Sequence, residues 1–266
     1  MTIRVCVAGA TGWAGSALSL GIAQATDMEL VAAVSRTHAG KTLGSVIHFD
    51  DLLAPVHATV AEVIAYKPDV LVEYTKPDVA KVHVVAALEG GAHVVVGTSG
   101  LTDDDYREID EVAQSAGRGV LAAGNFAITA VLLQKFAEAA ARYVPQWEII
   151  DYADAGKEDV PSGTVRELVN RLSRVRPPHK EVAIESLQGP QESRGAELDG
   201  TQVHSVRLPG YTLSVDAIFG MPDQRLILRH EAGASAEPYV EGALLAIRKV
   251  SGLVGVHRGL ATVMEM

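Results

Sequence analysis

The sequence predicts an α/β protein in which a doubly wound parallel sheet is followed by a second, α+β domain. In the first half of the chain, short apolar runs of strand character alternate with helical patterns, as in a parallel sheet between helices. After residue 143 strand patterns follow one another with few helices between them. The 266 residues are enough for one large domain or two smaller ones, and the change of rhythm favours two.

We expect the first domain to cover residues 1–127 and the second to cover residues 128–236, with residues 237–266 returning to the first. Strands of the first domain are expected at residues 3–8, 29–34, 70–74 and 93–96, and helices at 16–25, 79–88 and 103–116. In the second domain, helices at 128–143 and from residue 164 accompany strands at 148–153, 181–188, 201–208, 212–219 and 225–230. A last helix is expected at 237–249.

Composition excludes several classes of function. The formal charge of −10 argues against a nucleic-acid partner, because phosphate binding needs clustered Lys and Arg. The single cysteine, Cys6, lies in an apolar strand pattern, so neither an internal disulfide nor a multi-cysteine metal site is expected, and no other metal-ligand cluster is seen. No apolar run is long enough for a membrane span and no leader pattern opens the chain, so a cytoplasmic location is expected.

A glycine-rich turn joins the first strand to the first helix. It reads Gly9-Ala-Thr-Gly12-Trp-Ala-Gly15, and strand, glycine turn and helix together form the Rossmann-type dinucleotide-binding arrangement. The spacing is G-x-x-G-x-x-G, and a tight turn without a ligand would also use these glycines. The cofactor-binding candidates in this turn are Gly9, Ala10, Thr11, Gly12, Trp13 and Ala14.

The end of the second strand indicates which dinucleotide is bound. A carboxylate that accepts hydrogen bonds from the ribose of NAD usually stands here, whereas this chain has Ser35 and Arg36, followed by His38 and Lys41. A phosphate on that ribose would suit these cations, so NADP(H) is favoured and NAD(H) stays possible. Arg36 would also be unremarkable as a plain surface residue.

Further loops are expected at the same edge of the sheet, where ligands of such folds bind. They follow the strands that end near residues 74, 96 and 122. The cofactor-binding candidates in these loops are Thr75, Gly97, Thr98, Ser99, Ala123, Gly124, Asn125 and Phe126.

The stretch Lys157-Glu-Asp-Val-Pro-Ser-Gly-Thr164 predicts an anion site at the start of a helix. Ser162 and Thr164 suit an N-terminus, Gly163 permits close approach of a ligand, and the first helical amides lack internal partners. Lys157 would add a full positive charge. Lys157, Ser162, Gly163 and Thr164 are therefore candidates for binding a carboxylate or phosphate, although an ordinary loop and helix cap would use the same residues.

Together these motifs resemble the dihydrodipicolinate reductase family over nearly the whole chain. The glycine turn is similar to the family's GAxGRMG, Glu73-Tyr-Thr75 to D-F-T, Gly97-Thr-Ser-Gly100 to GTTG, and Gly124-Asn-Phe126 to P-N-F or A-N-F. Residues 157–164 resemble K-x-D-x-P-S-G-T, and Gly200-Thr201 resembles a later G-T. The resemblance implies a nucleotide-binding first domain, a second domain that binds a substrate carboxylate, and a homotetramer built through the sheet of the second domain, or at least a dimer.

The chain departs from the family pattern at its proton donor. Residues 157–164 are called the cradle below. The family carries E-x-H-H-x-x-K, with the lysine at the start of the cradle, whereas this chain has Ala153 and Asp154 in the places of the two histidines. The proton could then come from Lys157, Asp154, Tyr152 or a water, and we take Lys157 and Asp154 as the catalytic candidates. Asp154 would also suit a solvated turn.

Three hypotheses follow from this departure. The leading one is an NAD(P)H-dependent reductase, or reverse amine dehydrogenase, that acts on a carboxylate-bearing imine or iminium other than the lysine-pathway compound. The second is the orthodox 4-hydroxy-tetrahydrodipicolinate reductase of lysine and diaminopimelate synthesis. The third is a catalytically silent sensor that binds NADP(H).

Overall fold

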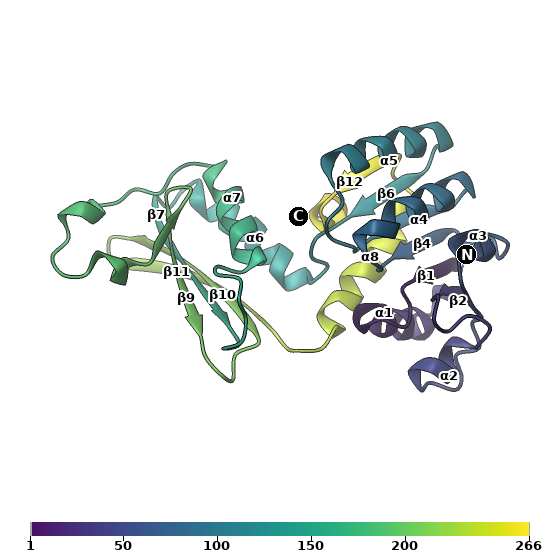
Figure 1. Cartoon of the computed structure of the whole chain (residues 1–266). Coiled ribbons are helices and arrows are strands. Elements are labelled where there is room, and N and C mark those ends of the chain that lie inside the picture. Colours follow the sequence, from purple (N-terminus) through teal and green to yellow (C-terminus); the bar gives the residue numbers. More distant parts are fainter. Residues whose placement is uncertain (1, 266) are drawn as a thin grey trace. The chain divides into compact units, whose positions relative to one another are not determined.

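The computed structural model describes residues 2–265, which form two compact units (Figure 1). The first unit contains the residues up to 128 together with those from 236 onwards, and residues 129–235 form the second. The predicted fold class is confirmed, because the first unit is built on a parallel sheet with helices and the second on a separate mixed sheet.

The first unit has a seven-stranded parallel sheet in the order β12-β6-β5-β4-β1-β2-β3. Its strands are β1 Ile3–Ala8, β2 Met28–Val34, β3 Val56–His57, β4 Val70–Glu73, β5 His93–Val96, β6 Gly119–Ala122 and β12 Gly255–Arg258. Their apolar runs are continuous, as expected for strands covered on both faces, and the last four residues of β1 are fully buried.

Helices lie on both sides of this sheet (Figure 1). One layer contains α3 Val60–Ile64, α4 Pro77–Glu89 and α5 Asp103–Ala116, and its apolar side chains share a core with those of the strands. On the other side α1 Trp13–Gln24 packs against α8 Val240–Val250, which brings the C-terminal segment back to this unit. A short helix, α2 Leu43–Ile47, precedes β3.

The second unit has a five-stranded mixed sheet in the order β11-β10-β7-β9-β8. Its strands are β7 Gln146–Ala153, β8 Ala196–Leu198, β9 Thr201–Arg207, β10 Leu213–Met221 and β11 Gln224–Ala232. The helices α6 Ile128–Ala141 and α7 Gly163–Ser173 share an apolar core with one face of the sheet. Burial alternates strictly along β7, so the other face is only half covered.

The predicted strand at residues 181–188 is wrong. This segment contains only a 3₁₀ turn, Ile184–Ser186, and its Val182 side chain is half exposed. The strand that pairs with the outer side of β9 is instead the short β8. Apolar alternation predicted a strand here, but a strand also needs a partner, and β9 pairs with other residues.

Among residues 2–265, no helix is both long and apolar enough to cross a membrane.

Candidate functional site

In the first unit, the candidate cofactor residues gather at the carboxyl edge of the parallel sheet. The order of the strands reverses between β1 and β4, and ligands of such sheets bind at this switch point. The chain leaves β1, β2, β4, β5 and β6 into the loops that begin at Gly9, Ser35, Tyr74, Gly97 and Ala123. The five loops that contain the candidate cofactor residues therefore lie at one edge of the sheet.

The glycine turn after β1 needs glycine for close packing. Gly9 has a φ of 82°, and a Cβ at this position would lie 2.1 Å from the carbonyl oxygen of Tyr74. A Cβ on Gly15 would meet the carbonyl oxygen of Gly9 at the same distance. Helix α1 then begins with Gly12 as N-cap, without a capping side chain or an acidic residue in its first turn. Its N-terminal amides and dipole therefore suit the pyrophosphate of a dinucleotide.

The end of β2 is joined to the glycine turn by side chains. The hydroxyls of Thr11 and Ser35 lie 2.9 Å apart, and Ser35 also contacts Nδ1 of His38 at 3.3 Å. Arg36 is exposed, and it takes part in none of the ion pairs between described residues. The guanidinium can therefore approach a ligand at this edge without leaving a carboxylate unpaired.

The remaining loops of this edge pack tightly together. Gly97 lies against the ring of Tyr74, which itself packs on the buried Phe126 with the ring centroids 6.1 Å apart. The hydroxyl of Thr98 accepts a hydrogen bond of 2.9 Å from the backbone amide of Thr75. Trp13 at the start of α1 is 61% exposed and contacts the Tyr239 ring edge-on.

Other predicted residues of this edge stay in reach of solvent. Ser99 and Gly124 are exposed, whereas Ala10, within the glycine turn, is fully buried. Asn125 uses its side-chain oxygen to accept the amide of Ala127, so it shapes the loop that follows β6.

In the second unit, residues 157–164 lead into the N-terminus of α7, as predicted. Ser162 is the N-cap, and its hydroxyl accepts the amide of Val165 at 3.4 Å. Gly163 is exposed and Thr164 is half-buried at the first two helical positions, where amides have no partner within the helix. The apolar face of α7 is buried and anchors the helix in the core. This helix end can therefore accept an anion.

A buried carboxylate supports the cradle from beneath. Asp151 is fully buried on β7 and accepts both the amide of Ser162, at 2.7 Å, and its hydroxyl, at 2.8 Å. Arg207 on β9 neutralises it through a 2.7 Å ion pair and also donates to the carbonyl of Asp159. Because Asp151 accepts both donors of Ser162, the side chain of Ser162 shapes the loop, and its direct contact with a substrate stays a prediction.

Lys157 lies in the loop between β7 and α7. Its Nζ is 2.7 Å from Oδ1 of Asp159, and the hydrogen bond from Lys157 lowers the pKa of the Asp159 carboxyl. The Lys157 side chain is one-third exposed, so the ammonium is accessible to a ligand. Asp154 is exposed, and its Oδ1 accepts the amide of Gly156 at 2.9 Å, which gives it the turn geometry that the sequence also allowed.

Ala153 and Tyr152 are two further residues near the expected proton donor. Ala153 is fully buried on the same face of β7 as Asp151, so its methyl group offers no proton. Tyr152 lies on the opposite face and donates to Asp216 at 3.2 Å, so it is wrong as a candidate donor beside α7. Lys157, Asp154 or a water remains for this role.

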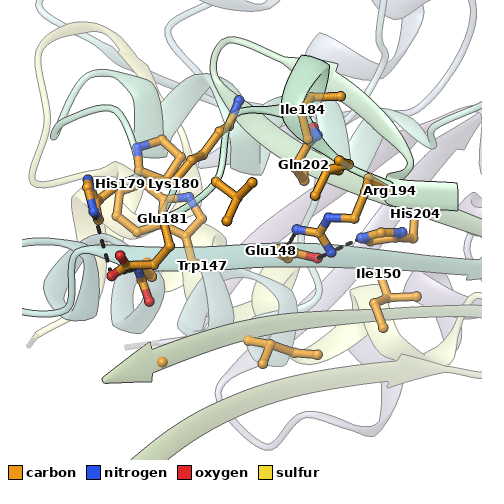
Figure 2. A pocket seen from close by; sticks show the side chains of 16 residues that line it. Trp147, Glu148, Ile150, His179, Lys180, Glu181, Ile184, Arg194, Gln202 and His204 are labelled. Carbon is orange, nitrogen blue, oxygen red and sulfur yellow. Dashed lines mark hydrogen bonds and ion pairs between the residues drawn. The ribbon is translucent and has the colours of Figure 1, made fainter. Parts of the chain in front are cut away.

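A separate cavity of about 600 Å³ lies on the half-covered face of the second sheet. Figure 2 shows Glu148 in it, directed toward Arg194 and His204, and Nε2 of His204 is 2.7 Å from the Glu148 carboxylate. Gln202 also lines this cavity, and its buried Oε1 has no hydrogen-bond donor among residues 2–265. None of the candidate site residues lines it.

Sequence reasoning did not find Asp151 and Arg207, which support the cradle, or His83, whose Nδ1 lies 2.9 Å from the buried carboxylate of Glu73; Glu73 itself was noted only as part of a motif. Asp151 and Arg207 are 56 positions apart, and only the pairing of β7 with β9 brings them together. The one available signal was a carboxylate at an inward position of a strand that leads to the cradle. The described residues 2–265 contain no group of His, Cys, Asp and Glu arranged to bind a metal.

Comparison with known proteins gives matches along the whole chain. A family model described as the N-terminus of dihydrodipicolinate reductase matches residues 3–126, and one described as its C-terminus matches residues 129–265. The 4-hydroxy-tetrahydrodipicolinate reductase of Bacillus pumilus is 36% identical over 99% of this chain and 98% of its own. The enzyme of the same name from Geobacillus kaustophilus is 36% identical over the full length of both chains.

One solved structure also matches almost the whole chain. The dipicolinate-bound dihydrodipicolinate reductase of Paenisporosarcina sp. TG-14 superposes with a TM-score of 0.88 at 31% identity, covering 99% of this chain and 100% of its own. An amine dehydrogenase from Mycobacterium smegmatis has a TM-score of 0.66 at 15% identity, covering 97% of this chain and 95% of its own, which is a likeness of fold alone.

Proposed function

The chain belongs to the dihydrodipicolinate reductase family, and on that premise we propose that it reduces 4-hydroxy-tetrahydrodipicolinate with NADPH. The end-to-end match and the dinucleotide-binding fold indicate an NAD(P)H-dependent oxidoreductase of this family's type. The observation that supports the substrate most directly is the cradle at the start of α7, where helix amides and Lys157 suit a carboxylate.

The carboxyl edge of the first unit fits the cofactor. The uncapped N-terminus of α1 would bind the pyrophosphate, and Arg36 would bind a phosphate on the adenosine ribose. The bound cofactor supplies a hydride from C4 of its nicotinamide. Since no carboxylate follows β2 at Ser35 or Arg36, we propose that NADP(H) is preferred to NAD(H).

In the second unit, Gly163 and Thr164 would donate backbone amides to one carboxylate of the substrate, and Lys157 would add its charge. Asp151 would keep the cradle in shape without touching the substrate. Protonation of the acceptor then falls to Lys157, Asp154 or a water, and a positioned acid is worth roughly 10²- to 10⁴-fold in rate.

One observation favours a second substrate. Ala153 and Asp154 stand where the family motif has its two histidines, and Ala153 is buried without a polar group to replace one. An iminium that already carries its proton would not need those histidines. We therefore keep a different carboxylate-bearing imine as the alternative. The order of the two substrates reverses the expectation from sequence alone, because the relatives named for the lysine-pathway reaction match over their full length.

The test is NADPH oxidation, followed by absorbance, with 4-hydroxy-tetrahydrodipicolinate beside a panel of carboxylated cyclic imines. Turnover of the first compound supports the proposal. Turnover of an imine alone would move the assignment to the alternative, and tight NADPH binding without any turnover would favour the silent sensor.

A pair of lysine variants tests the cradle in the same assay. Lys157→Met should raise the KM for the substrate by about tenfold or more, because a charge-assisted bond is lost. Lys249→Met is the control, since Lys249 is also an ion-paired lysine but lies in the first unit, outside the cradle.

A further inference from the structure

A buried carboxylate lies at the carboxyl edge of the first sheet. Glu73 ends β4 and is fully buried, although an isolated ionised carboxylate is costly to bury. It is satisfied by partners from three elements, which are the loops after β4 and β5 and helix α4. Such an arrangement needs a reason beyond packing.

One oxygen of Glu73 fixes two threonine hydroxyls. Oε1 accepts the amide of Thr75 at 3.0 Å, the Thr75 hydroxyl through a short hydrogen bond, and the Thr98 hydroxyl at 3.3 Å. The Thr98 oxygen in turn accepts the Thr75 amide. The loops that follow two neighbouring strands are thereby joined through a single carboxylate oxygen.

The other oxygen of Glu73 is fixed by a histidine. Nδ1 of His83, on α4, lies 2.9 Å from Oε2, and the imidazole is only 19% exposed. The carboxylate therefore cannot rotate freely about its last bond. Its Oε1 stays directed at Thr75 and Thr98, whose own positions at the carboxyl edge place them among the proposed cofactor contacts.

We propose that Glu73 and His83 are positioning residues that present the oxygens of Thr75 and Thr98 as hydrogen-bond acceptors to the nicotinamide end of the cofactor. Both hydroxyl hydrogens point to Glu73, so the Thr75 oxygen keeps two acceptor sites for the ligand, and the Thr98 oxygen, which already accepts the Thr75 amide, keeps one. An amide NH₂ group, such as the nicotinamide carboxamide, has the complementary donors. This inference rests on the proposed cofactor site. It assigns hydrogen-bond acceptors to the end of that site at which the nicotinamide would lie.

The experiment measures the affinity for two ligands, NADPH and 2′-phospho-ADP-ribose, which lacks the nicotinamide. His83→Leu removes the bond to Oε2, whereas His83→Gln can still donate to it. We expect His83→Leu and Glu73→Gln to weaken NADPH binding by about tenfold. Binding of the fragment should stay unchanged, and His83→Gln should restore most of the NADPH affinity.

A control and the melting temperature separate this role from a general loss of structure. His93→Gln alters another half-buried histidine of the first unit, at the start of β5, and should leave both affinities unchanged at neutral pH. Equal loss of both ligands in His83→Leu, or unchanged NADPH binding in both His83→Leu and Glu73→Gln, would overturn the inference. A wild-type protein that binds neither ligand would instead overturn the proposed cofactor site itself, and with it this inference.

Discussion

Single buried charges decide the shape of both candidate clusters. Glu73 and Asp151 are fully buried carboxylates that accept hydrogen bonds from the loops at which ligands are expected. Neither residue would contact a ligand in our proposals. A carboxylate is well suited to this role because it accepts several hydrogen bonds at once and so fixes the donors of a loop in one arrangement.

The buried carboxylate of Asp151 should contribute strongly to the stability of the second unit. Asp151→Ala leaves Arg207 with an uncompensated charge near the core and removes both acceptors from Ser162. Breaking a buried pair in this way costs roughly 3–5 kcal/mol, to be measured as the free energy of unfolding in urea. Asp151→Asn should fold better and raise the KM for the substrate while leaving NADPH affinity unchanged.

An exposed ion pair is the comparison for Asp151. Asp27 pairs with Arg248 on the surface of the first unit at 2.7 Å. Asp27→Asn should change the free energy of unfolding little, because solvent screens such pairs. A cost for Asp151→Ala as small as that of Asp27→Asn would contradict the supporting role of Asp151.

Arg36 provides a prediction about cofactor choice. Arg36→Ala should raise the KM for NADPH by about tenfold or more and leave the KM for NADH nearly unchanged, because only NADPH carries the additional phosphate. Arg107→Ala, which alters an exposed arginine of α5, is the matched control. Similar effects on the two cofactors would show that Arg36 does not select the phosphate.

Residue patterns also explain how much of the site could be foreseen. The glycine turn and the Ser162 cap were visible because they depend on neighbours a few positions away. The pairs Asp151 with Arg207 and Glu73 with Thr98 join residues 56 and 25 positions apart, so they depend on strand pairing. No local spacing encodes such contacts.

Among the elements, the parallel strands β1, β2, β4 and β5 could be predicted from the sequence. Their apolar runs are continuous because helices cover both faces, and this signal does not depend on the partner strand. The segment at residues 181–188 was also expected to form a strand and forms none, since β9 pairs with β8 and β7 instead. The short strands β3, β8 and β12 were not predicted either, because two to four residues carry too little pattern.

The pairing of β5 with β6 should be sensitive to pH. Nδ1 of His93 accepts the amide of Gly119 at 2.9 Å, which requires that nitrogen to be unprotonated. Burial, assisted by the charge of Arg118, lowers the pKa of His93. The unfolded chain therefore binds a proton more readily than the folded one. Stability from the neutral imidazole is fully present above the unfolded pKa of about 6.5 and is lost as the pH falls toward the lower folded value.

We expect the free energy of unfolding, measured in urea, to fall between pH 7 and pH 5.5. His93→Gln should show a smaller fall, because glutamine can still accept the Gly119 amide and does not titrate. The buried His230 has a pKa that burial lowers, so it contributes in the same direction and part of the fall should persist. An identical pH dependence in wild type and His93→Gln would show that His93 does not contribute.

In the whole molecule, the half-covered face of the second sheet has the features of an interface with a partner. Ile218 on β10 lies opposite Ile227 on β11 and Glu148 on β7, and Ile227 is half exposed. The cavity beside them is lined by Gln202, whose buried Oε1 has no donor among residues 2–265. A buried acceptor without a partner is costly, and an exposed apolar sheet face commonly marks an interface.

We propose that this face joins copies of the chain in a homotetramer. A dimer would be the smallest assembly that uses it. Light scattering should give the wild type about four times the chain mass of 28.1 kDa. Ile227→Arg should shift it to a lower mass, because an unpaired charge in an apolar interface costs several kcal/mol. Val82→Arg alters an exposed apolar residue on α4 and should leave the mass unchanged. A wild-type monomer would contradict the proposal and would leave the apolar face and the Gln202 acceptor to another partner.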